Sequence, residues 1–286
     1  MVGTPARRAA VAHLVATHAI SERRACRALS IPRSSHRYAS SSAERRLRLV
    51  RRIHALSDRY PRFGYRKVHW LLRGEGEGVG RETVRLIRRK EGLKVNRKRI
   101  RRRRRGASTG EVRRATHPGH VWSYDFVHDV TADGRTIRCL TVVDEFTRVC
   151  LAIEVRRSFT AGDVVDVLKR LVAEHGRPVH LRSDNGPEFV ARKVQHWLQE
   201  AGIATRYIEP GHPWENGTNE SFNGVFRDGC LDREVFHGLR DARHQIGRFR
   251  RMYNEERPHG ALNGRTPVQF ANKSRAAFAV MTAKAA

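Results

Sequence analysis

The run Val121-Trp-Ser-Tyr-Asp-Phe126 is apolar and aromatic, as in a strand, and it encloses one carboxylate, Asp125. Aspartate disfavours strands, so its presence there indicates a functional demand. Three other acidic residues compete for the same role, but they lie near a strand end, in a hairpin turn and at the close of a different strand: Asp129, Asp133 and Asp144. Asp125 is therefore the first candidate site residue.

Asp184 is the second candidate. It opens Asp184-Asn-Gly-Pro-Glu-Phe189, where Asn-Gly-Pro predicts a turn just after a short strand. Asp-Asn-Gly also forms turns without any catalytic role. However, the carboxyl end of a strand is where α/β sheets bind ligands.

The third candidate is one of four glutamates: Glu188, Glu209, Glu215 and Glu220. Glu220 opens a predicted helix, with 35 residues between it and Asp184. On that helix Asn223 and Arg227 share the face of Glu220, while Phe222 and Phe226 form the opposite apolar face. Helical geometry therefore favours Glu220.

Three carboxylates on separate elements are costly neighbours, because like charges repel and oppose burial. A divalent metal removes that conflict, since hard oxygen ligands suit Mg²⁺ or Mn²⁺. The chemistry that uses such a cluster is two-metal phosphoryl transfer.

Five motifs occur in an order that resembles the DDE integrase domain of bacterial insertion-sequence transposases. They are Trp122-Ser-Tyr-Asp-Phe126, Leu140-Thr-Val-Val-Asp-Glu-Phe-Thr-Arg148, Ser183-Asp-Asn-Gly-Pro-Glu-Phe189, Asn216-Gly-Thr-Asn-Glu-Ser-Phe-Asn-Gly224 and Tyr253-Asn-Glu-Glu-Arg-Pro-His259. The resemblance covers about Gly119 to Phe270, and the whole chain is similar to the second-reading-frame product of such elements. It implies a retroviral-integrase-like core with the ribonuclease H fold.

The resemblance also implies roles for the site residues. Asp125 would bridge two Mg²⁺ or Mn²⁺ ions, and Asp184 and Glu220 would each hold one. Residues expected to shape the site are Asn185, Gly186, His212, Asn216 and Asn223. The expected partners are double-stranded DNA (terminal inverted repeats and target), further copies of the chain, and a first-reading-frame protein of the same element.

Charge is distributed unevenly along the 286 residues, whose net charge is +28. Residues 1–116 carry a net charge of +25, and residues 117–286 carry only +3. This pattern favours a DNA-binding front half joined to a catalytic domain whose site stays acidic. A membrane surface is a poorer match, because the basic segments lack an apolar interfacial face.

The front half is predicted to be helical. Ser21 is a candidate N-cap, followed by the apolar stripe Ala25, Cys26 and Leu29. A second helical segment places Leu47, Val50, Ile53 and Leu56 at helical spacing, and Val68 with Leu71-Leu72 faces inward on the next helix. The residues expected to contact DNA are Arg33, Arg37, Arg81, Thr83, Arg85, Arg88, Arg101, Arg102, Arg103, Arg104, Arg105 and Arg227. The run of five arginines is expected to contact phosphates without sequence choice.

The back half alternates strands and helices. The predicted strands are Val121–Val130, Thr136–Asp144, Arg148–Val155, Val179–Arg182 and Ile203–Ile208. Thr160 and Asp163 form a predicted capping box before an amphipathic helix. The fold class expected is α/β, with a ribonuclease H-like mixed-sheet catalytic core preceded by helix-turn-helix DNA-binding domains.

Five segments are expected: residues 1–42 (helix-turn-helix-like), 43–96 (second helical DNA-binding domain), 97–117 (basic linker), 118–236 (core) and 237–286 (C-terminal helical extension). Four scattered cysteines without a Cys-x-x-Cys pair, and no apolar stretch near 18 residues, favour a cytoplasmic, nucleoid-associated bacterial protein without zinc. A catalytically silent DNA-binding regulator or transposase remnant, or a metal-dependent nuclease, is the alternative to a transposase.

Overall fold

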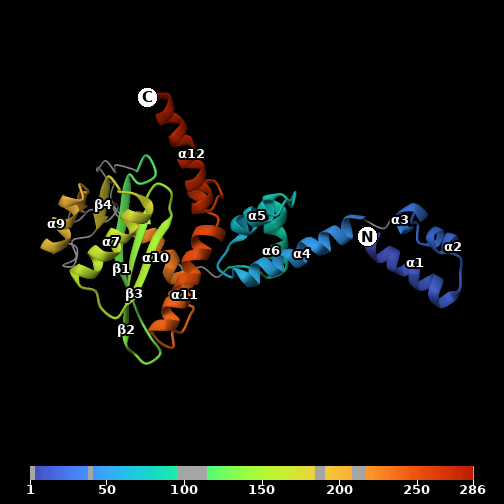
Figure 1. Cartoon of the computed structure of the whole chain (residues 1–286). Coiled ribbons are helices and arrows are strands. Elements are labelled where there is room, and N and C mark those ends of the chain that lie inside the picture. The colour runs from blue at the N-terminus through green and yellow to red at the C-terminus, as the bar shows by residue number, and fades with distance from the viewer. Residues whose placement is uncertain (1–3, 38–40, 96–114, 184–190, 208–216, 286) are drawn as a thin grey trace, which may run out of the picture. The chain divides into compact units, whose positions relative to one another are not determined.

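A computed structural model of the chain describes residues 4–37, 41–95, 115–183, 191–207 and 217–285 (Figure 1). The chain divides into two compact units, Met1–Tyr60 and Pro61–Ala286. The division falls inside residues 43–96, which the sequence analysis treats as one domain. None of the described helices is long and apolar enough to cross a membrane.

The first unit is helical. Its helices are α1 (Thr4–His18), α2 (Glu22–Ala28), α3 (Arg33–Arg37) and α4 (Ser41–Arg59). Ser21 caps α2 as predicted, because its hydroxyl accepts a hydrogen bond from Arg24 N at 3.4 Å. A small apolar cluster joins α1 to α2 and contains Val11, Ala25, Cys26 and Ile31.

The second unit opens with two helices, α5 (Tyr65–Gly74) and α6 (Arg81–Lys90), which contact each other. Val68 and Leu72 are buried on α5, and Val84 and Ile87 are buried on α6. Both helices therefore turn one apolar stripe inward and leave a basic face in solvent.

The core of the second unit is a five-stranded mixed sheet in the order β3-β2-β1-β4-β5. Its strands are β1 (Val121–Val130), β2 (Thr136–Asp144), β3 (Cys150–Arg156), β4 (His180–Ser183) and β5 (Ala204–Tyr207). β1, β2 and β3 form an antiparallel meander, whereas β4 pairs parallel with β1 and β5 pairs parallel with β4. This order confirms the ribonuclease H-like fold expected from the sequence.

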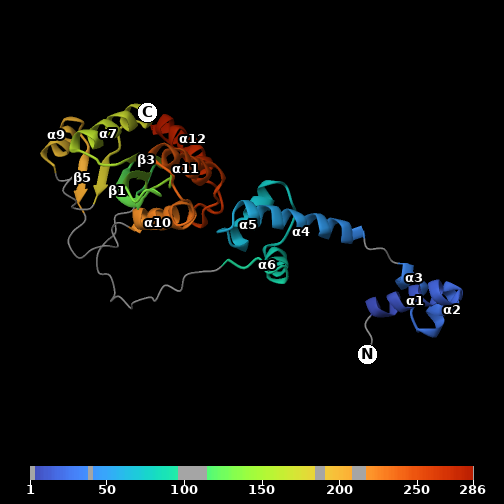
Figure 2. The same cartoon turned by 90° about the horizontal axis from the view of Figure 1, so that it is seen from below.

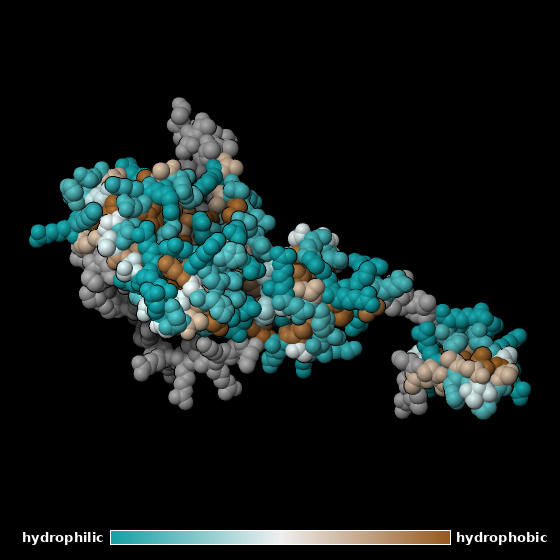
Figure 3. All heavy atoms as spheres, turned by 60° about the horizontal axis from the view of Figure 1, so that its bottom comes forward, coloured by the Kyte–Doolittle hydropathy of each residue, from teal (hydrophilic) through white to brown (hydrophobic). Residues whose placement is uncertain are grey.

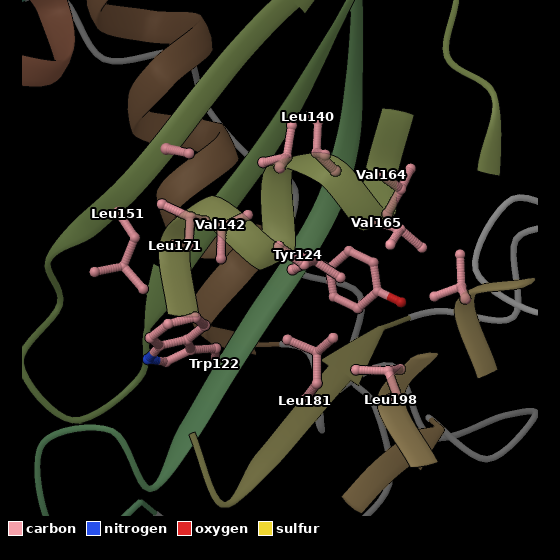
Figure 4. Packing of buried hydrophobic residues seen from close by; sticks show 14 of the residues in the cluster. Trp122, Tyr124, Leu140, Val142, Leu151, Val164, Val165, Leu171, Leu181 and Leu198 are labelled. Carbon is pink, nitrogen blue, oxygen red and sulfur yellow. The ribbon is translucent and has the colours of Figure 1, made fainter. Parts of the chain in front are cut away.

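Helices cover both faces of the sheet (Figures 1 and 2). The helices after the meander are α7 (Ala161–His175), α9 (Arg192–Glu200), α10 (Gly217–Phe226) and α11 (Leu239–Arg251). Trp122 and Tyr124 point toward α7 and α9 and pack there with Leu168 and Leu198 (Figure 4 shows Trp122, Tyr124 and Leu198). The side chains of Ser123, Asp125 and Val127 alternate with these, so they face α10 and α11.

The chain beyond α11 folds back onto β3. Its elements are a π-helical segment (Met252–Glu256), a short 3₁₀ helix (Gly260–Leu262) and α12 (Pro267–Ala285); another π-helical segment, Arg227–Leu231, continues α10. The Asn254 amide accepts a hydrogen bond from Cys150 N at 2.9 Å and donates one to Cys150 O at 2.9 Å. The Asn254 side chain thus forms with the backbone of Cys150 the two hydrogen bonds that a neighbouring strand would form. On the face shown in Figure 3, hydrophobic residues reach the surface only in small groups.

Several sequence predictions need correction. Leu47 is 51 % exposed, although it lies on the same helical stripe as the buried Ile53 and Leu56. Val179 is 46 % exposed and precedes β4, while β3 begins at Cys150 because Arg148 takes a left-handed backbone conformation with φ of 63°. All four cysteines are free and buried.

The capping box of α7 generates a stability prediction. Asp163 Oδ2 accepts hydrogen bonds from Thr160 N and Oγ1, both at 2.8 Å, and these bonds hold the pKa of Asp163 below its usual range. Asp163→Asn should therefore lower the free energy of unfolding by about 1 kcal/mol at pH 7. Because a lowered pKa stabilises only above the unfolded value of about 3.9, the difference from wild type should vanish as the pH falls through the folded-state pKa. Urea unfolding at pH 7 and pH 3 would measure the difference in the free energy of unfolding between Asp163→Asn and wild type. The control is Asp166→Asn, which changes an exposed aspartate on the same helix. A difference that is unchanged at pH 3 would contradict the role of the Asp163 carboxylate.

Candidate active site

Asp125 lies half-buried on the central strand β1. Its Oδ2 accepts a hydrogen bond from Asn223 Nδ2 at 2.7 Å, and its Oδ1 accepts one from Phe126 N at 2.8 Å. Its backbone carbonyl accepts a third from Thr141 Oγ1 at 3.1 Å. These contacts orient the carboxylate on the face of the sheet that α10 covers.

A second polar contact fixes α10 against β1. Ser123 Oγ donates to Asn219 Oδ1 at 3.1 Å, and both side chains are fully buried. Because Ser123 and Asp125 are two apart on a strand and Asn219 and Asn223 are four apart on a helix, both pairs lie on the facing sides of their elements. These two hydrogen bonds therefore fix the position of α10 along β1.

Glu220 lies on the first turn of α10 and is exposed to solvent. It precedes Asn223 by three residues, which places both on adjacent positions of the helix surface. Phe222 and Phe226 are buried in the core, as the sequence predicts. Arg227 follows α10 and is exposed on the same side as Glu220 by helical spacing.

The carboxyl end of β4 is anchored by a buried ion pair. Arg182 Nη1 donates to both oxygens of Glu145, at 2.9 and 3.0 Å, and the two side chains are 8 % and 6 % exposed. Arg182 pairs with Ser123 across the parallel ladder. Ser183 ends β4, and the next residue in the sequence is Asp184.

Several predicted site residues lie outside the part of the chain that the structure describes. They are Asp184, Asn185, Gly186, His212, Asn216, Arg101, Arg102, Arg103, Arg104 and Arg105. Three of the competing glutamates lie there too: Glu188, Glu209 and Glu215.

The competing aspartates have local structural roles. Asp144 is 4 % exposed and accepts hydrogen bonds from Gly119 N and Thr147 N, both at 2.7 Å. Asp133 accepts from Thr131 within the β1–β2 hairpin, and Asp129 accepts from Val130 N. Each is explained by the turn or strand end it stabilises.

The residues predicted to contact DNA have different surroundings. Arg33 and Arg37 are exposed on α3 and both reach the Glu22 carboxylate. Arg81 and Thr83 are exposed at the start of α6, and Arg85 forms an ion pair with Glu82 one turn earlier.

Arg88 is a correction to the sequence analysis. Its side chain is buried, with the residue 5 % exposed, and Nη2 donates to Leu93 O at 2.7 Å. Burial lowers the pKa of this guanidinium. The Arg88 side chain therefore faces the protein interior, where it binds a backbone carbonyl just beyond the carboxyl end of α6, and it does not face solvent.

Three residues that contribute to the site are not predicted from the sequence: Ser123, Thr141 and Asn219. Each acts through a partner at least 16 positions away in the sequence, which no periodicity reveals. Asn219 precedes Phe222 by three residues, so helical spacing places it beside the apolar face of α10, and this spacing is the available signal.

The donors present on α10 and β1 suit a hard divalent cation, because Asp125 and Glu220 offer carboxylate oxygens. Within the described residues no group of three acidic, histidine or cysteine side chains could hold a metal. Asp184, the third predicted ligand, lies outside the described residues.

A ribonuclease H-like sheet with a carboxylate on its first strand and another on the helix packed against it defines a core of the polynucleotidyl transferase class. Residues 115–213 and 201–267 match integrase core domain families, and residues 42–105 match an HTH-like domain family.

Known proteins resemble the chain over most of its length. A protein of insertion element IS407 from Burkholderia multivorans is 39% identical over 90% of this chain and 92% of its own length. The putative transposase InsK of element IS150 from Escherichia coli is 26% identical over 87% of this chain and 92% of its own length. Among solved structures, the catalytic core domain of HTLV-2 integrase in complex with magnesium is 20% identical, covers 55% of this chain and 99% of its own, and has a TM-score of 0.45.

The chain therefore belongs to the insertion-element transposases that carry an integrase core domain. Its integrase core and HTH-like domains imply DNA as a partner.

The Asn223–Asp125 hydrogen bond generates a second prediction. Asn223→Asp replaces a donor by a carboxylate against Asp125, so the folded state should lose about 1–3 kcal/mol at pH 7. The loss should shrink as the pH falls to about 4, where one proton can be shared between the two carboxylates.

Thermal melting across this pH range would measure the effect. Asn223→Ala, which removes the donor without adding charge, serves as the matched control and should show a smaller pH dependence. Equal pH profiles for the two variants would mean that residue 223 does not contact Asp125.

Proposed function

We propose that the chain cleaves the DNA ends of its insertion element and transfers them to target DNA, with Asp125, Asp184 and Glu220 as the catalytic carboxylates. The observation that carries the proposal is the hydrogen bond from Asn223 to Asp125 at 2.7 Å, which joins the helix bearing Glu220 to the strand bearing Asp125. The order of the three residues along an integrase core supports the same assignment.

The integrase core family depends on divalent metal ions, and its carboxylates fit Mg²⁺ or Mn²⁺. Asp125, Asp184 and Glu220 would hold two such ions, which supply activation of the attacking oxygen and charge stabilisation at phosphorus. The protein contributes orientation. Asn223 holds one oxygen of Asp125, Phe126 N holds the other, and the exposed Glu220 stays accessible to DNA.

DNA recognition is assigned to the front half. Arg33 and Arg37 on α3, and Arg81, Thr83 and Arg85 on α6, would contact the terminal repeats, while residues 101–105 would add affinity through phosphates. Arg227 would contact DNA beside the triad. We also propose that several copies of the chain assemble on DNA and that the chain associates with a first-reading-frame protein of the same element.

The triad generates a third prediction. Asp184→Asn should lower metal-dependent end cleavage and strand transfer at least about 100-fold while leaving DNA binding nearly intact, because one ligand charge is lost and no DNA contact. Asp125→Asn and Glu220→Gln should behave alike. Gel assays on labelled element ends with Mg²⁺ or Mn²⁺ would measure activity.

Asp129→Asn on the same strand is the matched control, since Asp129 only accepts a hydrogen bond from its neighbour Val130. Should the control lose as much activity as the triad variants, or Asp184→Asn keep more than about a hundredth of it, the triad assignment would be wrong.

The two basic segments generate a fourth prediction. Arg81 and Thr83 are exposed at the amino end of α6, where a recognition helix carries its reading residues. Arg81→Ala with Thr83→Ala should weaken binding to element ends by about 1–3 kcal/mol per lost base contact and spare random DNA. Replacing residues 101–105 by serine should weaken both DNAs by similar factors. Competition binding with end and scrambled duplexes at fixed salt separates the two, and the reverse pattern would refute the assignment.

A further inference from the structure

A cavity of about 590 Å³ lies beside α10, within the second unit. It is lined by Thr218 and Ser221 of α10, by the β2–β3 turn that contains Arg148, and by the segment Tyr253–Ala261. On the helix, Thr218 and Ser221 form one flank, whereas Glu220 and Asn223 form another. The cavity is therefore separate from the candidate triad, although the same helix borders both.

The charge of the cavity is strongly positive. Its basic lining residues are Lys67, Arg148, Arg182 and Arg257. Among the described residues that line it, Glu145 alone is acidic, and both its oxygens are already engaged by Arg182. An anion entering the cavity would therefore meet the positive charges of Arg148 and Arg257, neither of which forms an ion pair within the described residues.

Arg257 is the least compensated of these cations. Burial lowers the pKa of its guanidinium to about 10, and no acidic side chain in the described part of the chain forms an ion pair with it. Its guanidinium lies 5.4 Å from the centre of the Phe63 ring. Arg257 is half-buried, and a partly desolvated cation without a carboxylate partner is costly unless a bound anion or a specific structural gain compensates it.

His259 adds an unused polar group. Burial lowers its pKa to about 3, so the ring is neutral at pH 7. Its Nε2 is buried and has no hydrogen-bond partner within the described residues, while the ring packs edge-on against Tyr253. A neutral imidazole can donate one hydrogen bond to an oxygen placed in the cavity.

The backbone conformation of Arg148 positions its side chain at the cavity. Arg148 has a φ of 63°, and its Nη1 donates to Thr218 Oγ1 at 2.5 Å. A non-glycine residue in this conformation is uncommon and needs local support. Here the turn is held by the Asp144 carboxylate, which accepts from Thr147 N at 2.7 Å and from Thr147 Oγ1 at 2.8 Å.

We propose that this cavity binds a phosphate of an unpaired DNA strand, with Arg148, Arg257 and His259 as its ligands. The inference rests on the proposed function, since it assigns a second DNA site to the same core. Cavities of this size enclose groups as large as a small-molecule ligand, whereas a duplex, whose major groove alone is about 12 Å wide, is too broad to enter. The bound group is therefore one nucleotide of a single strand.

The test uses the full chain in EDTA, with thymidine 5′-monophosphate as probe and ligand-observed NMR as readout. Arg148→Gln removes a phosphate ligand, and Ser221→Phe fills the cavity from an exposed position without changing charge. Each should weaken nucleotide binding about tenfold or more. The controls are Arg240→Gln and Ser158→Phe, which make the same changes at exposed positions outside the cavity and should bind as wild type.

Inorganic phosphate should compete with the nucleotide, and thymidine alone should not bind. A single-stranded oligonucleotide should displace the probe, and a blunt duplex should not. Binding that is equal in the cavity variants and the controls would overturn the proposal. Binding of thymidine as tight as that of the nucleotide would overturn phosphate recognition, and displacement by the duplex would overturn the unpaired strand.

The outcome is distinguishable from failure of the proposed function, because the assay needs neither metal nor cleavage. Asp125→Asn should bind the nucleotide as wild type does. Within the described residues, the Arg148 side chain donates a hydrogen bond to Thr218 alone, so we expect Arg148→Gln to remain folded. Melting temperatures of the cavity variants would check that they are folded.

Discussion

The contact on which the site depends is polar and lies between a helix and a strand. Asn219 and Asn223 of α10 meet Ser123 and Asp125 of β1, across 96 and 98 positions of sequence. Apolar packing of Phe222 and Phe226 alone would tolerate small shifts of the helix, because it is not directional. Two hydrogen bonds one helical turn apart oppose such shifts, since a slip of the helix would break both and leave the buried Ser123 hydroxyl without Asn219. Glu220 is therefore carried to one place relative to Asp125.

Much of this fold is readable from the sequence, because its signals are local. Apolar, strand-like runs predicted the bounds of β1 and β2, the Thr160–Asp163 pattern predicted the start of α7, and helical spacing predicted the buried face of α10. Glu220 was selected by that spacing. The class of the core and the choice of Asp125 followed from motif order and from one carboxylate in an apolar strand.

The rest depends on tertiary contacts. The pairing of Arg182 with Glu145 spans 37 positions, and neither residue has a local pattern that indicates the other. Arg88 looked like a solvent-facing arginine of a recognition helix, yet a carbonyl beyond the helix end accepts its hydrogen bond. Leu47 has the spacing of a core residue but lies where α4 has nothing of its own unit to cover it. Periodicity reports which face a residue occupies and not what lies opposite that face.

Cations in this chain fall into two physical classes. The exposed arginines of the front half act over about 8 Å at physiological ionic strength and are screened by salt, so the affinity that we propose for them would be available to any polyanion. Arg182 and Arg257 are held in low-dielectric surroundings, where screening is weak and geometry decides the energy. Arg182 is matched by Glu145 and therefore stabilises the end of β4 instead of attracting DNA. Arg257 forms no ion pair within the described residues and, in our proposal, is matched by a bound phosphate. In the function proposed here, a chain of net charge +28 would bind DNA broadly through its surface and discriminate strand geometry through a few cations of the cavity.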